Sequence, residues 1–123
     1  MTIKLNLSGH QNDSLNALGF QFPGTIQVNP TTPIAETAKK LADFLVNLGI
    51  GSGDSVHIAV PGMSSLAVIS ITVIHGLTGQ FPILVSLVRQ ADGSFIATED
   101  SSIDLQTFRN EVCRSNRQNL ISL

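Results

Sequence analysis

Tryptophan and tyrosine are absent from this sequence of 123 residues, which has phenylalanine at six positions. Any stacking on a nucleobase would therefore fall to phenylalanine, histidine or arginine side chains. Cysteine is almost absent as well, because Cys113 is the single one. It cannot form an internal disulfide, which is typical of proteins in a reducing compartment. The first residues turn polar too early for a secretory signal, so we expect a cytoplasmic protein.

Charge is scarce too, since charged residues make up 13% of the chain, about half of the usual share of roughly 25%. Two interpretations of this scarcity stay open: part of the surface is buried in an oligomer, or the surface is rich in uncharged polar residues. The net charge of −2 argues against a partner such as duplex DNA, which needs a basic surface. It does not exclude a small anionic ligand, because helix N-termini bind phosphate through backbone N–H groups.

The chain also lacks a long hydrophobic run. Residues 66–77 are its most apolar stretch, which contains His75 and is too short to span a bilayer. We therefore expect no membrane partner. The length suits a single domain covering residues 1–123.

Hydrophobic periodicity predicts strands that alternate with helices. Strands are expected at residues 3–7, 25–28, 56–60, 82–88 and 94–97. Helices are expected at residues 15–18, from Thr32 and Pro33 to Gly49, at residues 64–80, and from Ser101 or Ser102 onward with Leu105, Phe108 and Val112 facing inward. This order predicts an α/β fold, a single Rossmann-like domain with a mainly parallel central sheet flanked by helices.

The segment 64–80 has an unusual apolar pattern. Residues 69–73 alternate as a strand would, but the length of the run and the nearby Gly76 and Gly79 favour a helix. On that helix the apolar side chains would cover about half of the circumference, beyond the usual stripe of about 100°. Such a helix needs a second apolar surface besides its own sheet. We therefore predict that two copies dimerise through residues 64–80.

Polar clusters follow the predicted strands, where parallel sheets bind their ligands. They are Ser8-Gly9-His10-Gln11, Pro61-Gly62-Met63-Ser64-Ser65 and Arg89-Gln90. Gly62 would let the backbone approach a ligand closely, and the amides and hydroxyls of Ser64 and Ser65 would hold a phosphate at a helix start. The same residues would serve equally as a helix start after a tight turn, with no ligand.

The three histidines suggest different roles. His10 suits a general acid or base, or a stacking partner for a base, but it would also be ordinary as an exposed loop residue. His57 and His75 are expected to be structural. The histidines and the cysteine lack the spacing of metal ligands, so we expect no metal and no other cofactor.

Three segments carry the most specific motifs of the chain. They are Leu5-Asn6-Leu7-Ser8-Gly9-His10, Pro61-Gly62-Met63-Ser64-Ser65, and His75-Gly76-Leu77-Thr78-Gly79-Gln80-Phe81-Pro82 with Arg89 beyond. Together and in this order, they resemble a small CRISPR-associated family of type III systems, among the Csx proteins proposed as ring nucleases. The resemblance covers most of the chain.

The resemblance implies a CARF-like domain, related to those that sense cyclic oligoadenylates. It implies a homodimer that binds cyclic tetra-adenylate, can assemble further on ligand binding, and dampens type III signalling by sequestration, slow ring cleavage or both. Any cleavage would be that of a metal-independent phosphodiesterase, with a ribose 2′-hydroxyl as nucleophile and His10 as the catalytic residue. The expected ligand-binding residues are Ser8, Gly9, His10, Gln11, Gly62, Met63, Ser64, Ser65, Gln80 and Arg89.

Two other functions fit the residues. One is an unrelated enzyme that binds a nucleotide or sugar phosphate on a Rossmann-like fold. The other is a non-catalytic structural dimer that pairs through its apolar helix.

Overall fold

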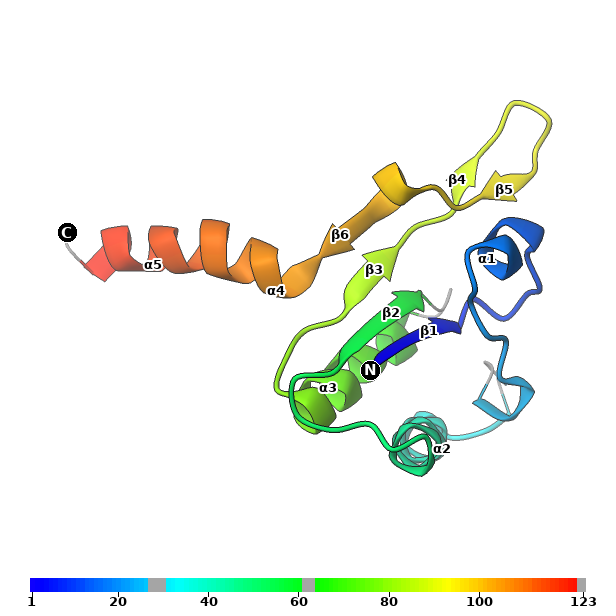
Figure 1. Ribbon diagram of the computed structural model, residues 1–123, viewed down its shortest axis with the longest axis horizontal. Helices are drawn as coiled ribbons and strands as arrows, with labels where there is room; N and C mark the ends of the chain where they lie inside the picture. The colour runs from blue at the N-terminus through cyan, green and yellow to red at the C-terminus, as the bar shows by residue number, and fades with distance from the viewer. Residues whose placement is uncertain (27–30, 61–63, 122–123) are drawn as a thin grey trace.

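The computed structural model describes residues 1–26, 31–60 and 64–121, and Figure 1 shows the course of the chain. The strands are β1 (Thr2–Asn6), β2 (Ser55–Ala59), β3 (Ile83–Val85), β4 (Val88–Arg89), β5 (Phe95–Ile96) and β6 (Ser102–Asp104). The helices are α1 (Asp13–Ala17), α2 (Ile34–Asn47), α3 (Ser64–Thr78), α4 (Leu105–Phe108) and α5 (Arg114–Ile121), with a π-helical segment, Arg109–Cys113, joining the last two. None of the helices in the described ranges is long and apolar enough to cross a membrane.

Four strands form one sheet in the order β1-β2-β3-β6. The first three are parallel neighbours, and β6 returns antiparallel to β3. The carboxyl ends of β1, β2 and β3 therefore meet at one edge of the sheet. The hairpin of β4 and β5 lies beyond that edge (Figure 1). The predicted α/β class with a mainly parallel sheet is thus confirmed.

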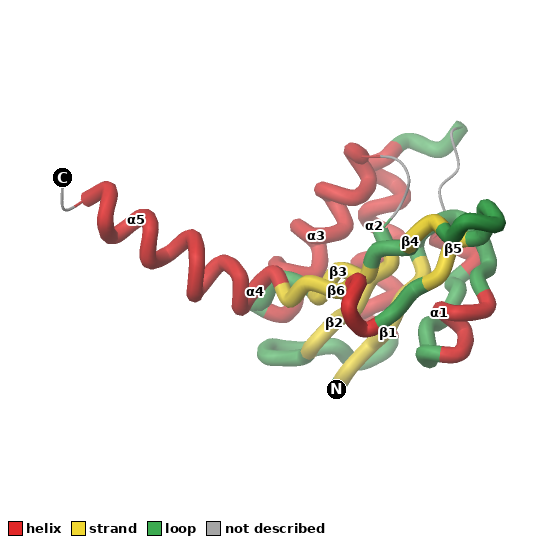
Figure 2. The backbone as a smooth tube through the Cα atoms, turned by 90° about the horizontal axis from the view of Figure 1, so that it is seen from above, coloured by secondary structure: helices red, strands yellow, loops and turns green. Residues whose placement is uncertain are grey.

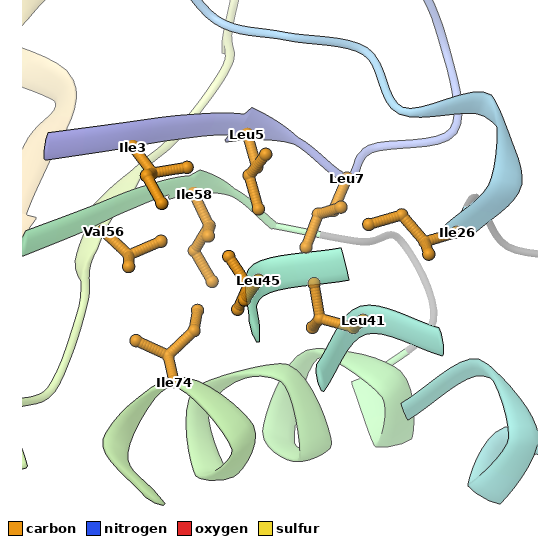
Figure 3. Close-up of a cluster of buried hydrophobic side chains, with 9 residues drawn as sticks. All are labelled: Ile3, Leu5, Leu7, Ile26, Leu41, Leu45, Val56, Ile58 and Ile74. Atoms are coloured by element: carbon orange, nitrogen blue, oxygen red, sulfur yellow. The ribbon is translucent and has the colours of Figure 1, made fainter. Parts of the chain in front are cut away.

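The main core lies between this sheet and two helices on one of its faces. Both α2 and α3 lie beneath the strands, and Figure 3 shows Leu41, Leu45 and Ile74 pointing from these helices toward β1 and β2. The buried cluster comprises Ile3, Leu5, Leu7, Ile26, Leu41, Leu45, Val56, Ile58 and Ile74. The helices predicted from Thr32 and Pro33 to Gly49 and at residues 64–80 are present as α2 and α3. Gly49 ends α2 with a φ of +83°, a conformation that glycine adopts without strain.

The opposite face of the sheet is covered at its carboxyl end. Side chains alternate along a strand, so Ala59 and Val85 point away from the main core. There they pack with Leu15 of α1 and with Phe20 in a second, smaller cluster. The short helix expected at residues 15–18 corresponds to α1, which begins two residues earlier.

The single strand predicted at residues 82–88 is wrong. The segment forms two short strands, β3 and β4, separated by Ser86 and Leu87. At this point the chain leaves the sheet, and the Ser86 amide donates to the Ser101 carbonyl at 3.0 Å. The turn predicted at Asp92 and the return strand at 94–97 are confirmed by the pairing of β4 with β5.

The strand predicted at residues 25–28 is also wrong in its described part. Residues 24–26 form a 3-10 turn, in which the Ile26 amide donates to the Pro23 carbonyl at 3.2 Å, and Ile26 fills the core. The outer edge of β1 pairs instead with Gln21, whose carbonyl accepts from the Asn6 amide at 2.7 Å. Val28 lies outside the described residues.

The predicted starts of two helices, at Thr32 and at Ser101 or Ser102, need correction. Thr32 does not cap α2, because Pro33 is the N-cap residue and its carbonyl accepts from the Glu36 amide at 3.0 Å. The last helix is capped by Asp104, whose carboxylate accepts from the Thr107 amide at 3.1 Å. Ser101 and Ser102 lie before that cap, in a 3-10 turn and in β6.

The last helix does not face inward as predicted. Residues 102–104 form β6, which pairs with β3 at the edge of the sheet. The helix therefore begins at this edge and projects away from the sheet (Figures 1 and 2). Phe108 and Val112 are accordingly 45% and 43% exposed, and Leu105 is half-buried.

The open part of the sheet's second face carries a histidine that should make stability sensitive to acid. His57 is paired in register with Lys4. Burial lowers the pKa of His57 below its ordinary 6.5, the Lys4 charge lowers it further, and Asp104 acts weakly in the opposite sense. The unfolded chain therefore takes up this proton first as the pH falls, and acid then favours unfolding.

We expect the melting temperature of the wild type to fall between about pH 7.5 and about pH 5.5 more steeply than that of His57→Gln. Stability from the neutral imidazole is fully present above the unfolded pKa and is lost below it. Differential scanning fluorimetry at both pH values measures the two slopes, with His10→Gln as a control that leaves His57 in place. Equal slopes in wild type and His57→Gln would show that this group does not sense the pH.

Candidate functional site

The loops after β1 and β2 emerge side by side at the carboxyl edge of the sheet. The two strands pair in register from Thr2 with Ser55 to Asn6 with Ala59. The pairing continues by one bond, because the Leu7 amide donates to the Ala59 carbonyl at 3.0 Å. The first polar cluster, which begins at Ser8, therefore lies next to the chain that leads into the second.

A buried asparagine organises the first of these loops. Asn6 is fully buried, and its amide nitrogen donates to the His10 carbonyl at 2.8 Å. Its side-chain oxygen accepts from the Ser8 amide at 3.0 Å and from the Ser8 hydroxyl at 2.6 Å. Gly9 completes the turn with a φ of +90°, which other residues adopt only with strain. The backbone of residues 8–10 is thus held from beneath, while the His10 side chain is exposed.

The second loop leads into α3 after a short connection. Ser64 and Ser65 form the first turn of this helix, and both are exposed. Their amides belong to the helix N-terminus, where backbone N–H groups lack carbonyl partners within the helix and favour an anion. Gly62 and Met63, which were also predicted to bind the ligand, lie outside the described residues.

A hollow lies where β2 and β3 end. It has a volume of about 200 Å³ and is lined by Ala59, Val60, Val85, Ser86 and Leu87. Four of these five side chains are apolar, a lining that suits a flat ring such as a base. We call residues 8–10, Ser64, Ser65 and this hollow the strand-end site.

The hairpin of β4 and β5 is tied to the segment after the first loop. Asn12 donates from its side chain to the Phe95 carbonyl at 2.9 Å. The Ala97 amide donates to the Ser14 hydroxyl at 2.8 Å. These bonds bring Arg89, an exposed residue of β4, to the same end of the molecule as Gln11. Both predicted residues therefore flank the strand-end site.

Gln80 lies apart from the other predicted residues. It follows α3, whose 15 residues span roughly 20 Å, and so it lies near the amino ends of the strands. Its amide donates to the Thr78 hydroxyl at 3.1 Å. In the same region the rings of His75 and Phe81 are 4.3 Å apart. Within one chain, Gln80 therefore does not meet the ligand candidates at the strand ends.

The chemistry available at the strand-end site is hydrogen bonding more than charge. Within residues 1–26, 31–60 and 64–121, no group of three or more histidine, cysteine or acidic side chains is placed to hold a metal ion. The polar groups are backbone amides, serine hydroxyls and the His10 imidazole, with Arg89 at the margin. Such a set suits a phosphodiester, whose oxygens accept several hydrogen bonds.

Sequence reasoning missed Asn6 and Asn12. Asn6 occupies a polar position in the alternating sequence of β1, yet it is fully buried. Asn12 caps α1 by accepting from the Leu15 amide at 3.1 Å. An asparagine followed by an acidic residue is a common helix start, so the Asn12-Asp13 pair could have revealed this cap.

Replacing Asn6 tests whether it holds the first loop. In Asn6→Ala the Ser8 amide, the Ser8 hydroxyl and the His10 carbonyl each lose a hydrogen bond to the Asn6 side chain, and we expect a loss of about 1–3 kcal/mol in the free energy of unfolding. Urea denaturation measures this loss, with the exposed Asn47→Ala on α2 as the matched control. Equal stability of the two variants would contradict the assigned role.

Comparisons of the chain with protein-family models, with curated proteins and with solved structures found no match.

Proposed function

We propose that this chain is a Rossmann-like, CARF-like domain that binds cyclic tetra-adenylate at the strand-end site within a homodimer. It would dampen type III CRISPR signalling by sequestering the messenger, with any ring cleavage slow. One observation carries the proposal. Two segments that resemble the Csx family, one ending at His10 and one ending at Ser65, lead to the carboxyl ends of adjacent parallel strands.

The chemistry of the ligand fits these groups. Cyclic tetra-adenylate presents phosphodiesters, which accept hydrogen bonds from amides and hydroxyls, and adenines, which need flat apolar contacts. Ser64 and Ser65 offer amides and hydroxyls for the phosphodiesters, at a helix N-terminus. The hollow at the carboxyl ends of β2 and β3 offers an apolar surface for an adenine. A net charge of −2 is compatible with this mode, because backbone dipoles supply the positive potential.

A homodimer suits the symmetry of the ligand. A ring of four identical nucleotides has a two-fold axis, which can coincide with the axis of a dimer so that each copy supplies one site. Ile71, Val73 and Leu77 of α3 pack against the core of their own chain. The outward side of α3 offers Val68, which is 64% exposed, for such a contact, beside the exposed Thr72.

The first loop favours sequestration over rapid catalysis. His10 is exposed and its backbone is held by Asn6, so its imidazole is the best placed group for proton transfer. In the described part of the chain, no hydrogen bond or ion pair joins His10 to a carboxylate that would orient it. Positioning of the 2′-hydroxyl would then supply most of any rate acceleration.

Binding is tested with radiolabelled cyclic tetra-adenylate in a gel-shift titration. Removal of a hydrogen bond to a charged group costs about 1.5–3 kcal/mol, so Ser64→Ala should raise the Kd roughly 10- to 100-fold. Ser52→Ala, an exposed serine in the turn before β2, is the matched control and should bind like wild type.

Equal binding by wild type and Ser64→Ala would show that the ligand does not bind at the start of α3. Absence of any binding, together with binding of a mononucleotide or a sugar phosphate, would favour the unrelated enzyme. Binding of none of these would favour the structural dimer.

Product analysis separates sequestration from cleavage. With ligand in excess, wild type should return most of the ring intact, and any linear product should fall roughly 10²- to 10⁴-fold in His10→Ala. Chromatography of the labelled products measures both. Rapid multiple-turnover cleavage by wild type would overturn sequestration as the main activity, and cleavage that survives in His10→Ala would exclude His10 as the proton-transfer group.

A further inference from the structure

The C-terminal helix is unsupported by the rest of its own chain. We call residues 105–121 the arm; it comprises α4, the π-helical segment and α5. The main contacts of the arm with the sheet come from α4, at β3 and β6, whereas the remaining turns contact mainly their neighbours in the arm itself. Figures 1 and 2 show the arm leading away from the body in two perpendicular views. Isolated helices of roughly 15 residues are marginal in water, so this one needs a partner surface.

The arm carries apolar side chains on its exposed surface. Phe108 and Val112 are spaced by one turn and are 45% and 43% exposed, and Leu120 near the end is exposed as well. The one cysteine, Cys113, is also exposed here. Apolar residues at this spacing form the stripe by which a helix packs against another element.

The body has an uncovered apolar surface beside the base of the arm. The main core contains residues of β1 and β2, with Leu84 of β3 at its margin, and none of β6. Ile103 of β6 pairs in register with Leu84 and so faces the helix side of the sheet, yet it is 41% exposed. Beside α3 on this side lies a groove of about 290 Å³ lined by Ile71, Phe81, Leu105, Phe108, Arg109 and Cys113. We call it the edge groove; α3, Phe81 and the base of the arm form its walls.

We infer that two copies of this chain exchange their arms, so that the apolar stripe of each arm fills the edge groove of the other copy. The stripe and the groove occur on one chain and share Phe108. A two-fold arrangement therefore covers both on each copy at once. An arm of 17 helical residues is roughly 25 Å long, which is enough to cross a neighbouring groove.

Charge favours a second copy as the occupant. The arm holds three of the seven basic residues and one of the nine acidic ones, so it carries +2, and the rest of the chain carries −4. A hollow on the arm is lined by all three arginines, Arg109, Arg114 and Arg117. The positive arm is attracted to the negative body of another copy, whereas two arms repel each other.

This inference rests on the homodimer of the proposed function. Its test uses no ligand, so a failure of arm exchange is distinguishable from a failure of cyclic tetra-adenylate binding. Sedimentation velocity at micromolar concentration should give wild type a mass of twice the 13.1 kDa chain. Phe108→Glu should raise the dimer dissociation constant roughly 30-fold or more, as expected for a central apolar contact. Val46→Glu is the matched control, because Val46 is 56% exposed on α2, and it should dimerise like wild type.

Cys113 gives a second measurement that locates the interface. Its rate of reaction with a maleimide should fall as wild type is concentrated into the dimer, and should not depend on concentration in Phe108→Glu. If circular dichroism shows that Phe108→Glu does not fold, Val112→Glu replaces it with the same expectation. A monomeric wild type would overturn the inference. A dimer in which Cys113 reacts as fast as in the monomer, and which Phe108→Glu leaves intact, would also overturn it and would leave α3 alone as the interface.

Discussion

The parallel pairing of β1 with β2 is the constraint on which the rest of this structure depends. Five register pairs join the two strands, and they align two loops that are more than fifty residues apart in the sequence. The pairing also requires a crossover between the strands, and that crossover contains α2. The next crossover contains α3, which lies beside α2 on the same face. Position of the site, core and helix layer all follow from one ladder of backbone hydrogen bonds.

Inside this frame, Asn6 converts a strand end into a defined loop. A fully buried amide is costly to desolvate unless its hydrogen bonds are made. Here the donor and the acceptor of the side chain are both used, on the two sides of Gly9. These hydrogen bonds hold the backbone of residues 8–10 from the sheet side, so the loop needs no contact on its solvent side to stay ordered. Such a surface is open to a ligand while its backbone stays ordered, which is the preorganisation that binding requires.

The second structural theme is incomplete coverage of the sheet. Two long helices cover one face, and α1 covers the other face only at the carboxyl end. The antiparallel β6 adds a fourth strand without adding a helix above it, and the arm that follows leaves the body. The low share of charged residues would suit burial of this edge in the proposed homodimer, because surfaces that are buried in an assembly carry fewer charges. A strand-end site and an apolar edge then lie at opposite ends of the sheet.

Local patterns in the sequence were sufficient for most of the elements. The apolar stripe of residues 34–48 determined α2, and the length of the run from Ser64 outweighed its strand-like alternation, because hydrophobic period and length are properties of neighbouring residues. The alternation of elements also indicated the carboxyl edge where residues 8–10, Ser64 and Ser65 lie. These parts could be predicted because a helix or a strand is selected mainly by contacts close in sequence.

What only the tertiary structure decided involves partners far along the chain. The break in residues 82–88 separates β3, which pairs with β6, from β4, which pairs with β5, and no local signal marks where the partner strand changes. The start of the last helix at Asp104 depends on β6 pairing with β3, which uses residues that would otherwise extend the helix. The separation of Gln80 from the strand ends follows from the direction of α3 across the sheet. Burial of Asn6 likewise depends on Ala59 and Gln21 closing around β1, since a strand residue is buried only by the elements packed against it.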